Sequence, residues 1–195
     1  MAYIGNKPAN KAVVASDLDP AVITGQTALA TSPADTDEFL ISDAGTLKRI
    51  DASLVGGGGK VLQVISANYS TQLSTTPSSF TDSGLSASIT PSATSSKILI
   101  LAHNSTWVSS ASYVYTGIQR NISGGSSTFL GDATYGLTVS LDNQGSGGDV
   151  HTINYLDSPS TTSAITYDFQ YKCGSTCQIQ KAGSMAVMTL MEIGA

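Results

Sequence analysis

From Lys60 to the C-terminal end, short apolar segments alternate with clusters of Ser, Gly, Pro and Asn, and this rhythm restricts the fold more than any other feature. Segments this short, bounded by turn-forming residues, are typical of β-strands. The pattern predicts strands over residues 61–69, 85–89, 97–102, 113–120, 128–130, 135–139, 150–156, 164–172, 178–181 and 185–193. Roughly eight to ten strands at this spacing indicate an all-β fold, a sandwich of two sheets of the jelly-roll type.

The choice of polar residues supports strands over helices. Charged residues make up only 12% of the chain, whereas Ser and Thr account for 51 of its 195 residues. Solvent-facing helices usually carry Glu, Lys and Arg, while the outer faces of strands tolerate Thr and Ser. No stretch longer than a turn has the apolar period of a helix.

Proline and glycine divide the chain ahead of the sandwich. Residues 1–26 carry scattered apolar side chains and are interrupted by Pro8 and Pro20, which predicts an extended arm that needs a surface to lie on. Residues 56–59 are four glycines, too flexible for the interior of a strand or helix, so they predict a linker. The β-sandwich domain then spans residues 60–195.

Residues 27–55 form a second unit in this prediction, a small β-hairpin module. Two short apolar segments, 38–41 and 46–50, flank the turn-forming sequence Ser-Asp-Ala-Gly. A lone hairpin is marginal in water. We therefore expect it to pack on a neighbouring copy of itself or on the surface that receives the arm.

The charge balance excludes two classes of partner. The net charge of −5 and the isoelectric point near 4.7 repel nucleic acid and anionic membranes. The N-terminal sequence MAYIGNKPANKAVV has no export signal, and the longest apolar run, 98–102, is too short to span a bilayer. We expect a soluble chain without membrane insertion.

Ionisable residues are too scattered to predict an enzyme. His103 ends one predicted strand and His151 lies inside another, as ordinary sheet histidines do. No Gly-x-Ser-x-Gly elbow is present, and the aspartates lack the spacing of a calcium loop. Two carboxylates can still meet from distant strands, so a paired-carboxylate hydrolase stays open without support from spacing. We predict no catalytic residue, no metal and no cofactor.

Cys173 and Cys177 enclose Gly-Ser-Thr between two predicted strands. Three interpretations stay open: a disulfide across a hairpin loop, half of a zinc site, or two free thiols. Zinc needs two more ligands, and neither histidine is near in the sequence.

Aromatic residues mark a candidate contact surface. Trp107, the only tryptophan, lies in the polar segment 104–112, with Tyr113 and Tyr115 just beyond it. Exposed aromatics on a loop of a rigid sandwich can hold a sugar ring or a partner protein. The alternative is that Trp107 covers one end of the core or a seam between subunits.

Several segments resemble tail-fibre and other virion structural proteins of tailed bacteriophages, especially marine ones. They are Met-Ala-Tyr-Ile-Gly-Asn at 1–6, Glu-Phe-Leu-Ile-Ser-Asp-Ala-Gly-Thr-Leu-Lys-Arg-Ile at 38–50, Lys-Val-Leu-Gln-Val-Ile-Ser-Ala at 60–67, Leu-Ser-Ala-Ser-Ile-Thr-Pro-Ser-Ala-Thr-Ser-Ser-Lys-Ile-Leu at 85–99, Tyr-Leu-Asp-Ser-Pro-Ser-Thr-Thr at 155–162 and Thr-Leu-Met-Glu-Ile at 189–193. The resemblance covers nearly the whole chain, and it is the joint order of these segments that makes it specific.

The resemblance implies a virion-surface protein, a homotrimer whose N-terminal arm attaches to other virion proteins. The chain has no room for a shaft, so it would be a short fibre or knob. As an adhesin for a host glycan or protein, it would use loops around Trp107, Tyr113, 121–127 and 145–149. As a capsid decoration protein or head fibre, it would depend on the arm residues Tyr3, Ile4, Val13 and Val14. A glycan-cleaving depolymerase is disfavoured, because the chain is poor in acids and has no repeat coils for a β-helix.

Overall fold

The computed structural model describes residues 27, 33–34, 36–44, 46–55, 60–142 and 146–194. The predicted arm, with its candidate anchoring residues, and the four-glycine segment lie outside the described residues. Contacts within the chain divide it into two units, Met1–Gly56 and Gly57–Ala195.

The first unit contains an antiparallel hairpin followed by one helical turn. Its elements are β1 (Glu38–Asp43), β2 (Thr46–Asp51) and α2 (Ala52–Val55). The register runs from Glu38 opposite Asp51 to Asp43 opposite Thr46, which confirms the two strands predicted here. Every residue of β1 is exposed, including Phe39 and Leu40, so the hairpin has no core of its own.

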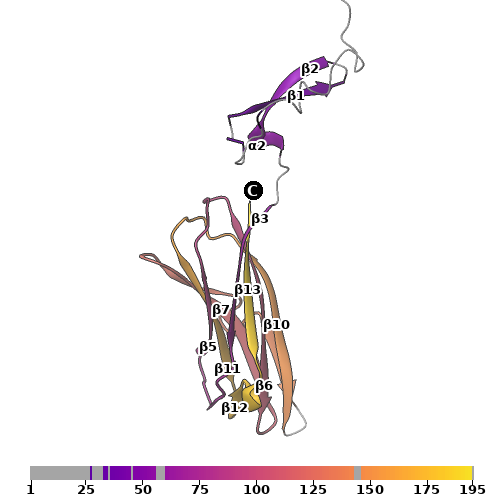
Figure 1. Ribbon diagram of the computed structural model, residues 1–195. Helices are drawn as coiled ribbons and strands as arrows, with labels where there is room; N and C mark the ends of the chain where they lie inside the picture. Colours follow the sequence, from indigo (N-terminus) through magenta and orange to yellow (C-terminus); the bar gives the residue numbers. More distant parts are fainter. Residues whose placement is uncertain are drawn as a thin grey trace, which may run out of the picture. The chain divides into compact units, whose positions relative to one another are not determined.

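The second unit is a sandwich of two antiparallel sheets (Figure 1). The first sheet comprises β3 (Val61–Tyr69), β13 (Ala186–Ile193), β6 (Lys97–Val108), β10 (Gly147–Asp157), β12 (Cys177–Ile179) and β4 (Leu73–Thr75). The second comprises β5 (Thr81–Ile89), β11 (Ile165–Cys173), β7 (Ser112–Ile122), β8 (Ser127–Leu130) and β9 (Thr138–Asp142). A 3₁₀ turn, η2 (Lys181–Gly183), connects β12 to β13.

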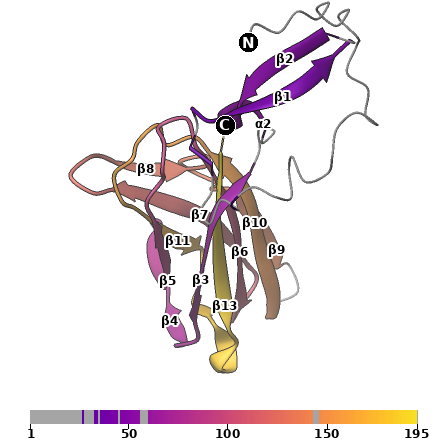
Figure 2. The ribbon, with the colours of Figure 1, turned by 45° about the horizontal axis from the view of Figure 1, so that its top comes forward.

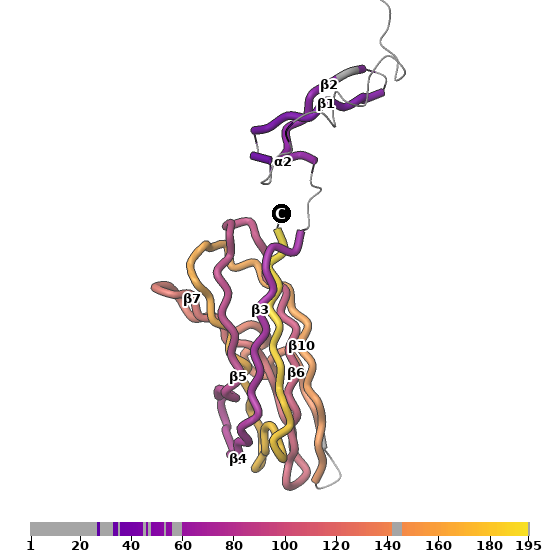
Figure 3. The backbone as a smooth tube through the Cα atoms, in the orientation of Figure 1, coloured from indigo at the N-terminus to yellow at the C-terminus, as the bar shows by residue number. Residues whose placement is uncertain are grey.

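The strand order is that of a jelly roll. The four long strands of the first sheet lie in the order β3-β13-β6-β10, and the second sheet runs β5-β11-β7, with β8 and β9 both pairing with β7. Successive long strands therefore alternate between the sheets, as two Greek keys require. Figure 3 shows the result most plainly: β3 and β13, from opposite ends of this unit, lie side by side. The predicted jelly-roll-like sandwich is confirmed.

Alternation of apolar and polar residues places the core between the sheets. In β11 the buried residues are Ile165, Tyr167, Phe169, Tyr171 and Cys173, and the residues between them face outward. The C-terminal strand β13 buries every second residue in the same way, and it lies between β3 and β6 (Figure 2). The C-terminal strand is therefore paired on both sides within the first sheet.

A bulge bends β5 where it pairs with β11. Gly84, at this bulge, has a φ of 83°, in the left-handed region that glycine adopts without strain. The ring of Tyr69 packs so close to Gly84 that a Cβ there would overlap it. Both the conformation and the close approach therefore require glycine at this position.

Several predicted strand boundaries are wrong: β5 begins at Thr81 and β10 at Gly147, earlier than predicted. Two other errors have identifiable reasons. The strand predicted over 135–139 begins only at Thr138, because Asp132 Oδ1 accepts hydrogen bonds from the amides of Thr134 and Tyr135 and holds them in a turn. The strand predicted over 97–102 continues to Val108. The prediction stopped early because Asn104 and Thr106 are polar, but both face inward and are buried. The three-residue strand β4 was not predicted at all.

Candidate binding site

The aromatic residues singled out from the sequence do not form one surface. Trp107 lies in strand β6 and not in a loop, as the sequence had suggested. Side chains alternate along β6, and the next residue, Val108, points into the core, so Trp107 faces outward from the first sheet. Tyr113 and Tyr115, which flank Val114 on β7, face outward from the second sheet. The sandwich therefore separates the tryptophan from the two tyrosines by its full thickness.

Trp107 forms the floor of a groove on the outer face of the first sheet, which we call the Trp107 groove. It has a volume of about 450 Å³, within the range of small-molecule sites. Its lining residues come from β6, β10 and the turn after β12: Ser105, Thr106, Trp107, Gly148, Asp149, Val150, Lys181, Ala182 and Ser184. The Lys181 ammonium lies 3.4 Å from the centroid of the Trp107 ring, a cation–π contact.

The two tyrosines belong to a wider aromatic surface on the second sheet, the tyrosine platform. Tyr113 and Tyr115 stack with ring centroids 4.5 Å apart, and Tyr135 meets Tyr115 edge-on at 5.5 Å. On β9, Leu141 pairs with Tyr113 and Val139 with Tyr115, and both aliphatic side chains are more than half exposed. Sequence reasoning missed Tyr135, Val139 and Leu141, because only the pairing of β7 with β9 brings them beside the two tyrosines.

Lys172 fixes one side of the tyrosine platform. It pairs across the sheet with Tyr115, and its ammonium lies 5.1 Å from the centroid of that ring and 4.9 Å from the centroid of Phe80. The ammonium also donates a hydrogen bond of 2.6 Å to the carbonyl oxygen of Thr134, in the turn that carries Tyr135. One lysine thus holds strand, turn and rings together.

The outer face of the first sheet carries a row of apolar side chains, the apolar row. Val64, Met191, Leu99 and Leu156 lie opposite one another in the registers of β3, β13, β6 and β10. Val64 is 53% exposed and Leu156 is 50% exposed. Apolar side chains aligned across four strands on a solvent-facing surface favour contact with another molecule.

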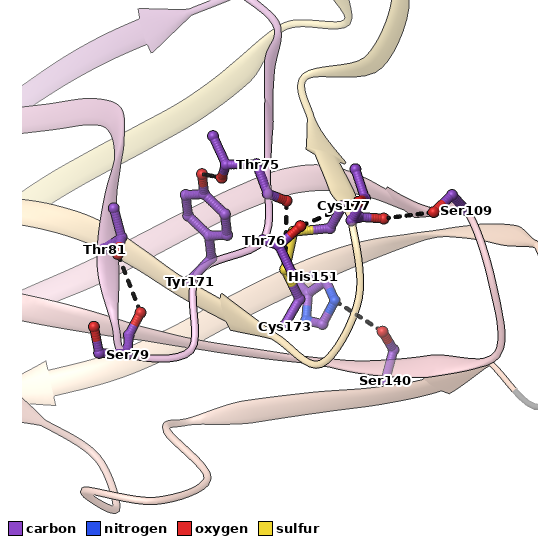
Figure 4. Close-up of a disulfide and its surroundings, with 11 residues drawn as sticks. Thr75, Thr76, Ser79, Thr81, Ser109, Ser140, His151, Tyr171, Cys173 and Cys177 are labelled. Atoms are coloured by element: carbon purple, nitrogen blue, oxygen red, sulfur yellow. Dashed lines mark hydrogen bonds between the residues drawn. A yellow bond between two sulfur atoms is a disulfide. The ribbon is translucent and has the colours of Figure 1, made fainter.

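Cys173 and Cys177 are joined by a disulfide, which closes the connection between β11 and β12. Both residues are buried and pack with Val108, Val114 and Ile179 in a second, smaller core. Figure 4 shows the hydrogen bonds around this end, including that of the Tyr171 hydroxyl to Thr75 Oγ1, at 2.8 Å. The disulfide ties the start of β12 to the end of β11, and Gln178 of β12 pairs with Trp107.

His151 is buried on β10 beside a hollow that shares Asp149 and Val150 with the Trp107 groove. Its Nδ1 lies 2.8 Å from Thr138 Oγ1 and its Nε2 lies 3.1 Å from Ser140 Oγ (Figure 4 shows the second contact). Burial lowers the pKa of His151 to about 4, against the smaller opposing effect of the Asp149 charge. The imidazole is therefore neutral at neutral pH, and its two contacts join β10 of the first sheet to β9 of the second. His103, on β6, is exposed.

Among the described residues of both units, no three His, Cys, Asp or Glu side chains come together in a way that could hold a metal ion. No helix of the described residues is long and apolar enough to cross a membrane.

No protein-family model matches the chain, and no curated protein does. Among solved structures, the chain is similar to a chain in the structure of infectious bursal disease virus, Gx strain. The identity is 11% and the TM-score 0.36, over 78% of this chain and 39% of the viral chain. It is also similar to the VP2 subviral particle of that virus, with 9% identity and a TM-score of 0.30 over 81% of this chain and 44% of the other.

The chain thus spans about two fifths of the length of the viral chains it matches. At these identities and TM-scores the likeness carries no argument about the fold, ligands or partners of this protein.

Proposed function

We propose that this protein is a non-enzymatic structural protein of a bacteriophage particle, a short trimeric fibre or knob. Its N-terminal arm attaches to the particle, and its β-sandwich faces the host surface. The resemblance of its sequence segments to virion proteins of tailed phages supports this assignment. The observation that carries the attachment role is the tyrosine platform, in which Tyr113, Tyr115 and Tyr135 lie on the outside of a rigid sheet.

The tyrosine platform suits attachment because its rings are held in place without being buried. Lys172 contacts Tyr115 and bonds to the turn of Tyr135, so little conformational freedom is left to lose on binding. Tyrosine rings combine apolar area with a polar hydroxyl, which suits contacts with partners that are partly wet.

The apolar row is the surface we assign to trimer formation. The resemblance implies a trimer. Around a three-fold axis, each copy would present the same aliphatic side chains to the other two. Leu156→Lys places a charge in this row and should convert the trimer to monomers that remain folded. Ser86→Lys, on an exposed position of β5 in the other sheet, is the matched control and should leave the trimer intact. Sedimentation equilibrium measures both, and a wild-type mass near 20 kDa would contradict the trimer.

Attachment to the particle is tested by deleting residues 1–26. We expect the truncated protein to fold but to be absent from purified particles. If it still joined the particle, the arm and its residues Tyr3, Ile4, Val13 and Val14 would not be the anchor.

Immunogold labelling of intact particles tests the function as a whole. Label confined to the tail supports the host-binding fibre. Label around the head favours the alternative, a capsid decoration protein or head fibre. Particles without label would overturn the assignment to the virion.

A further inference from the structure

The Trp107 groove is open because a side chain is missing from one of its walls. Gly148 on β10 pairs directly with Trp107 on β6, so a side chain there would stand beside the indole. A Cβ added to Gly148 would lie 3.2 Å from Trp107 Cδ1 and 3.1 Å from the Thr106 carbonyl oxygen. Gly148 does not have a left-handed φ, so its backbone does not demand glycine. The residue is needed for the space that it leaves.

The opposite wall is held in a strained conformation. Gln180 and Ala182, on either side of Lys181, have φ values of 51° and 57°, which residues other than glycine adopt at a cost. Gln180 is fully buried, and its backbone N–H donates a hydrogen bond of 3.1 Å to the Ser105 carbonyl oxygen. The amide of Ala182 donates to Gln72 Oε1 at 2.8 Å. Strain of this kind is concentrated at ligand sites, and here it places Lys181 over the indole.

The groove combines an aromatic ring with hydrogen-bonding groups. The Lys181 ammonium can donate hydrogen bonds, and the Ser105 and Ser184 hydroxyls, which bond to each other, can donate and accept them. Asp149 pairs with the buried Thr106, so its side chain lies on the other face of β10 from Trp107 and contributes negative charge, but no hydrogen bond, to the groove. In the described part of the chain, Lys181 and Asp149 belong to none of the ion pairs, which join Lys48–Asp43, Arg49–Glu38 and Arg120–Asp157. The groove therefore has little net charge and suits a neutral ligand that carries many hydroxyl groups.

A sugar ring has the remaining property that the groove requires. One face of a pyranose presents C–H groups with a slight positive charge, which pack against the negative face of an aromatic ring. Val150, 65% exposed beside the indole, extends this apolar contact. The hydroxyl groups around the ring edge would then reach Lys181 and the Ser105 and Ser184 hydroxyls.

We propose that the Trp107 groove binds a neutral pyranose unit of a polysaccharide, a ligand assignment that rests on the proposed attachment function. The Lys181 side chain moves off the indole as the sugar enters, and its ammonium donates to a ring hydroxyl. Gly148 provides the room, and the Ser105 and Ser184 hydroxyls orient the ligand by exchanging hydrogen bonds with its hydroxyl groups.

The chain has a single tryptophan, so its fluorescence reports directly on this groove. The full-length protein is titrated with the methyl glycosides of glucose, galactose, mannose and N-acetylglucosamine, and with methyl glucuronide as an acidic counterpart. We expect a saturable change in Trp107 emission with at least one neutral glycoside and a dissociation constant in the millimolar range, as for other small ligands of few atoms.

Variants locate the binding. Gly148→Val fills the groove with a residue that favours strands and should weaken binding by about tenfold or more, with Gly148→Ala intermediate. Lys181→Met keeps the aliphatic reach and should weaken binding by removing the ammonium. Ser86→Ala, on the exposed face of β5 in the other sheet, is the control and should bind as the wild type does.

Three results would overturn the inference: no saturable change with any neutral glycoside, binding of methyl glucuronide alone, or unchanged affinity in a folded Gly148→Val protein. None of these bears on particle labelling, so the virion assignment and the ligand assignment fail separately.

Discussion

Replacing Arg120 by methionine should cost the β-sandwich about 3–5 kcal/mol of its unfolding free energy, because the change leaves a carboxylate buried without its charged partner. Arg120 extends from β7 in the second sheet to Asp157 on β10 in the first. Its Nη1 lies 2.7 Å and 3.0 Å from the two carboxylate oxygens. The side chains are only 15% and 5% exposed, so water replaces little of the lost contact.

Tyr167 completes the network and provides a second, smaller perturbation. Its hydroxyl donates a hydrogen bond of 2.7 Å to Asp157 Oδ2, and burial raises the pKa of that hydroxyl, so it remains a donor throughout the usual pH range. Tyr167→Phe removes one hydrogen bond to a charged acceptor and should cost about 1.5–3 kcal/mol. The triple variant Arg120→Met, Asp157→Val, Tyr167→Phe removes all polar partners together and should recover most of the loss, since apolar replacement of a buried pair is often neutral.

Urea denaturation at one protein concentration, followed by circular dichroism, measures these differences. With an m-value of about 2 kcal/mol/M, the Arg120→Met midpoint should fall by about 2 M. The exposed Lys97, at the start of β6, is the control, and Lys97→Met should change stability by less than about 0.5 kcal/mol. The reasoning is refuted if Arg120→Met costs under about 1 kcal/mol, or if the triple variant costs as much as the single changes added together.

Three further predictions concern other buried groups. Because burial lowers the His151 pKa from 6.5 to about 4, the unfolded chain binds its proton first, and melting experiments should show stability falling by about 3 kcal/mol between those pH values; an identical loss in His151→Gln would contradict this. Burial raises the pKa of Glu192, but hydrogen bonds from Gln63 and Ser92 outweigh it and lower the pKa from 4.5 to about 2. The wild type should therefore lose further stability as the pH falls from 4.5 to about 2. The stability of Glu192→Gln should depend less on pH over that range. Replacing both cysteines by alanine should cost about 2 kcal/mol in urea unfolding, since the disulfide closes a short loop, and an unchanged midpoint would show that the bond adds no stability.

Much of the fold is encoded in local pattern. The strand predicted over 61–69 coincides with β3, and those over 164–172 and 185–193 differ from β11 and β13 by one residue at their ends. These strands have regular alternation, so each local segment specifies its own buried face. Prediction failed where a long-range contact satisfied a polar group: the buried Asn104 amide meets the Gln180 side chain at 2.8 Å, and this hid the second half of β6.

The candidate sites were harder to predict than the strands. The sequence drew attention to Trp107, Tyr113 and Tyr115 because aromatic residues near polar segments are conspicuous. It gave no sign that Gly148 faces Trp107 or that Lys181 covers it, since these residues are brought to the indole by β10 and the turn before β13. Tyr135 likewise joins Tyr115 only through the turn that Asp132 closes.

The sequence by itself determined that this chain forms short strands and a sandwich, because alternation and turn chemistry act between residues close in the chain. It also determined the low charge and the abundance of small hydroxyl residues on the outer faces. Only the tertiary structure decided which strands pair, and therefore which side chains meet across them. The Trp107 groove, the tyrosine platform and the apolar row each depend on register between strands far apart in sequence, and that register is set by how the whole core packs.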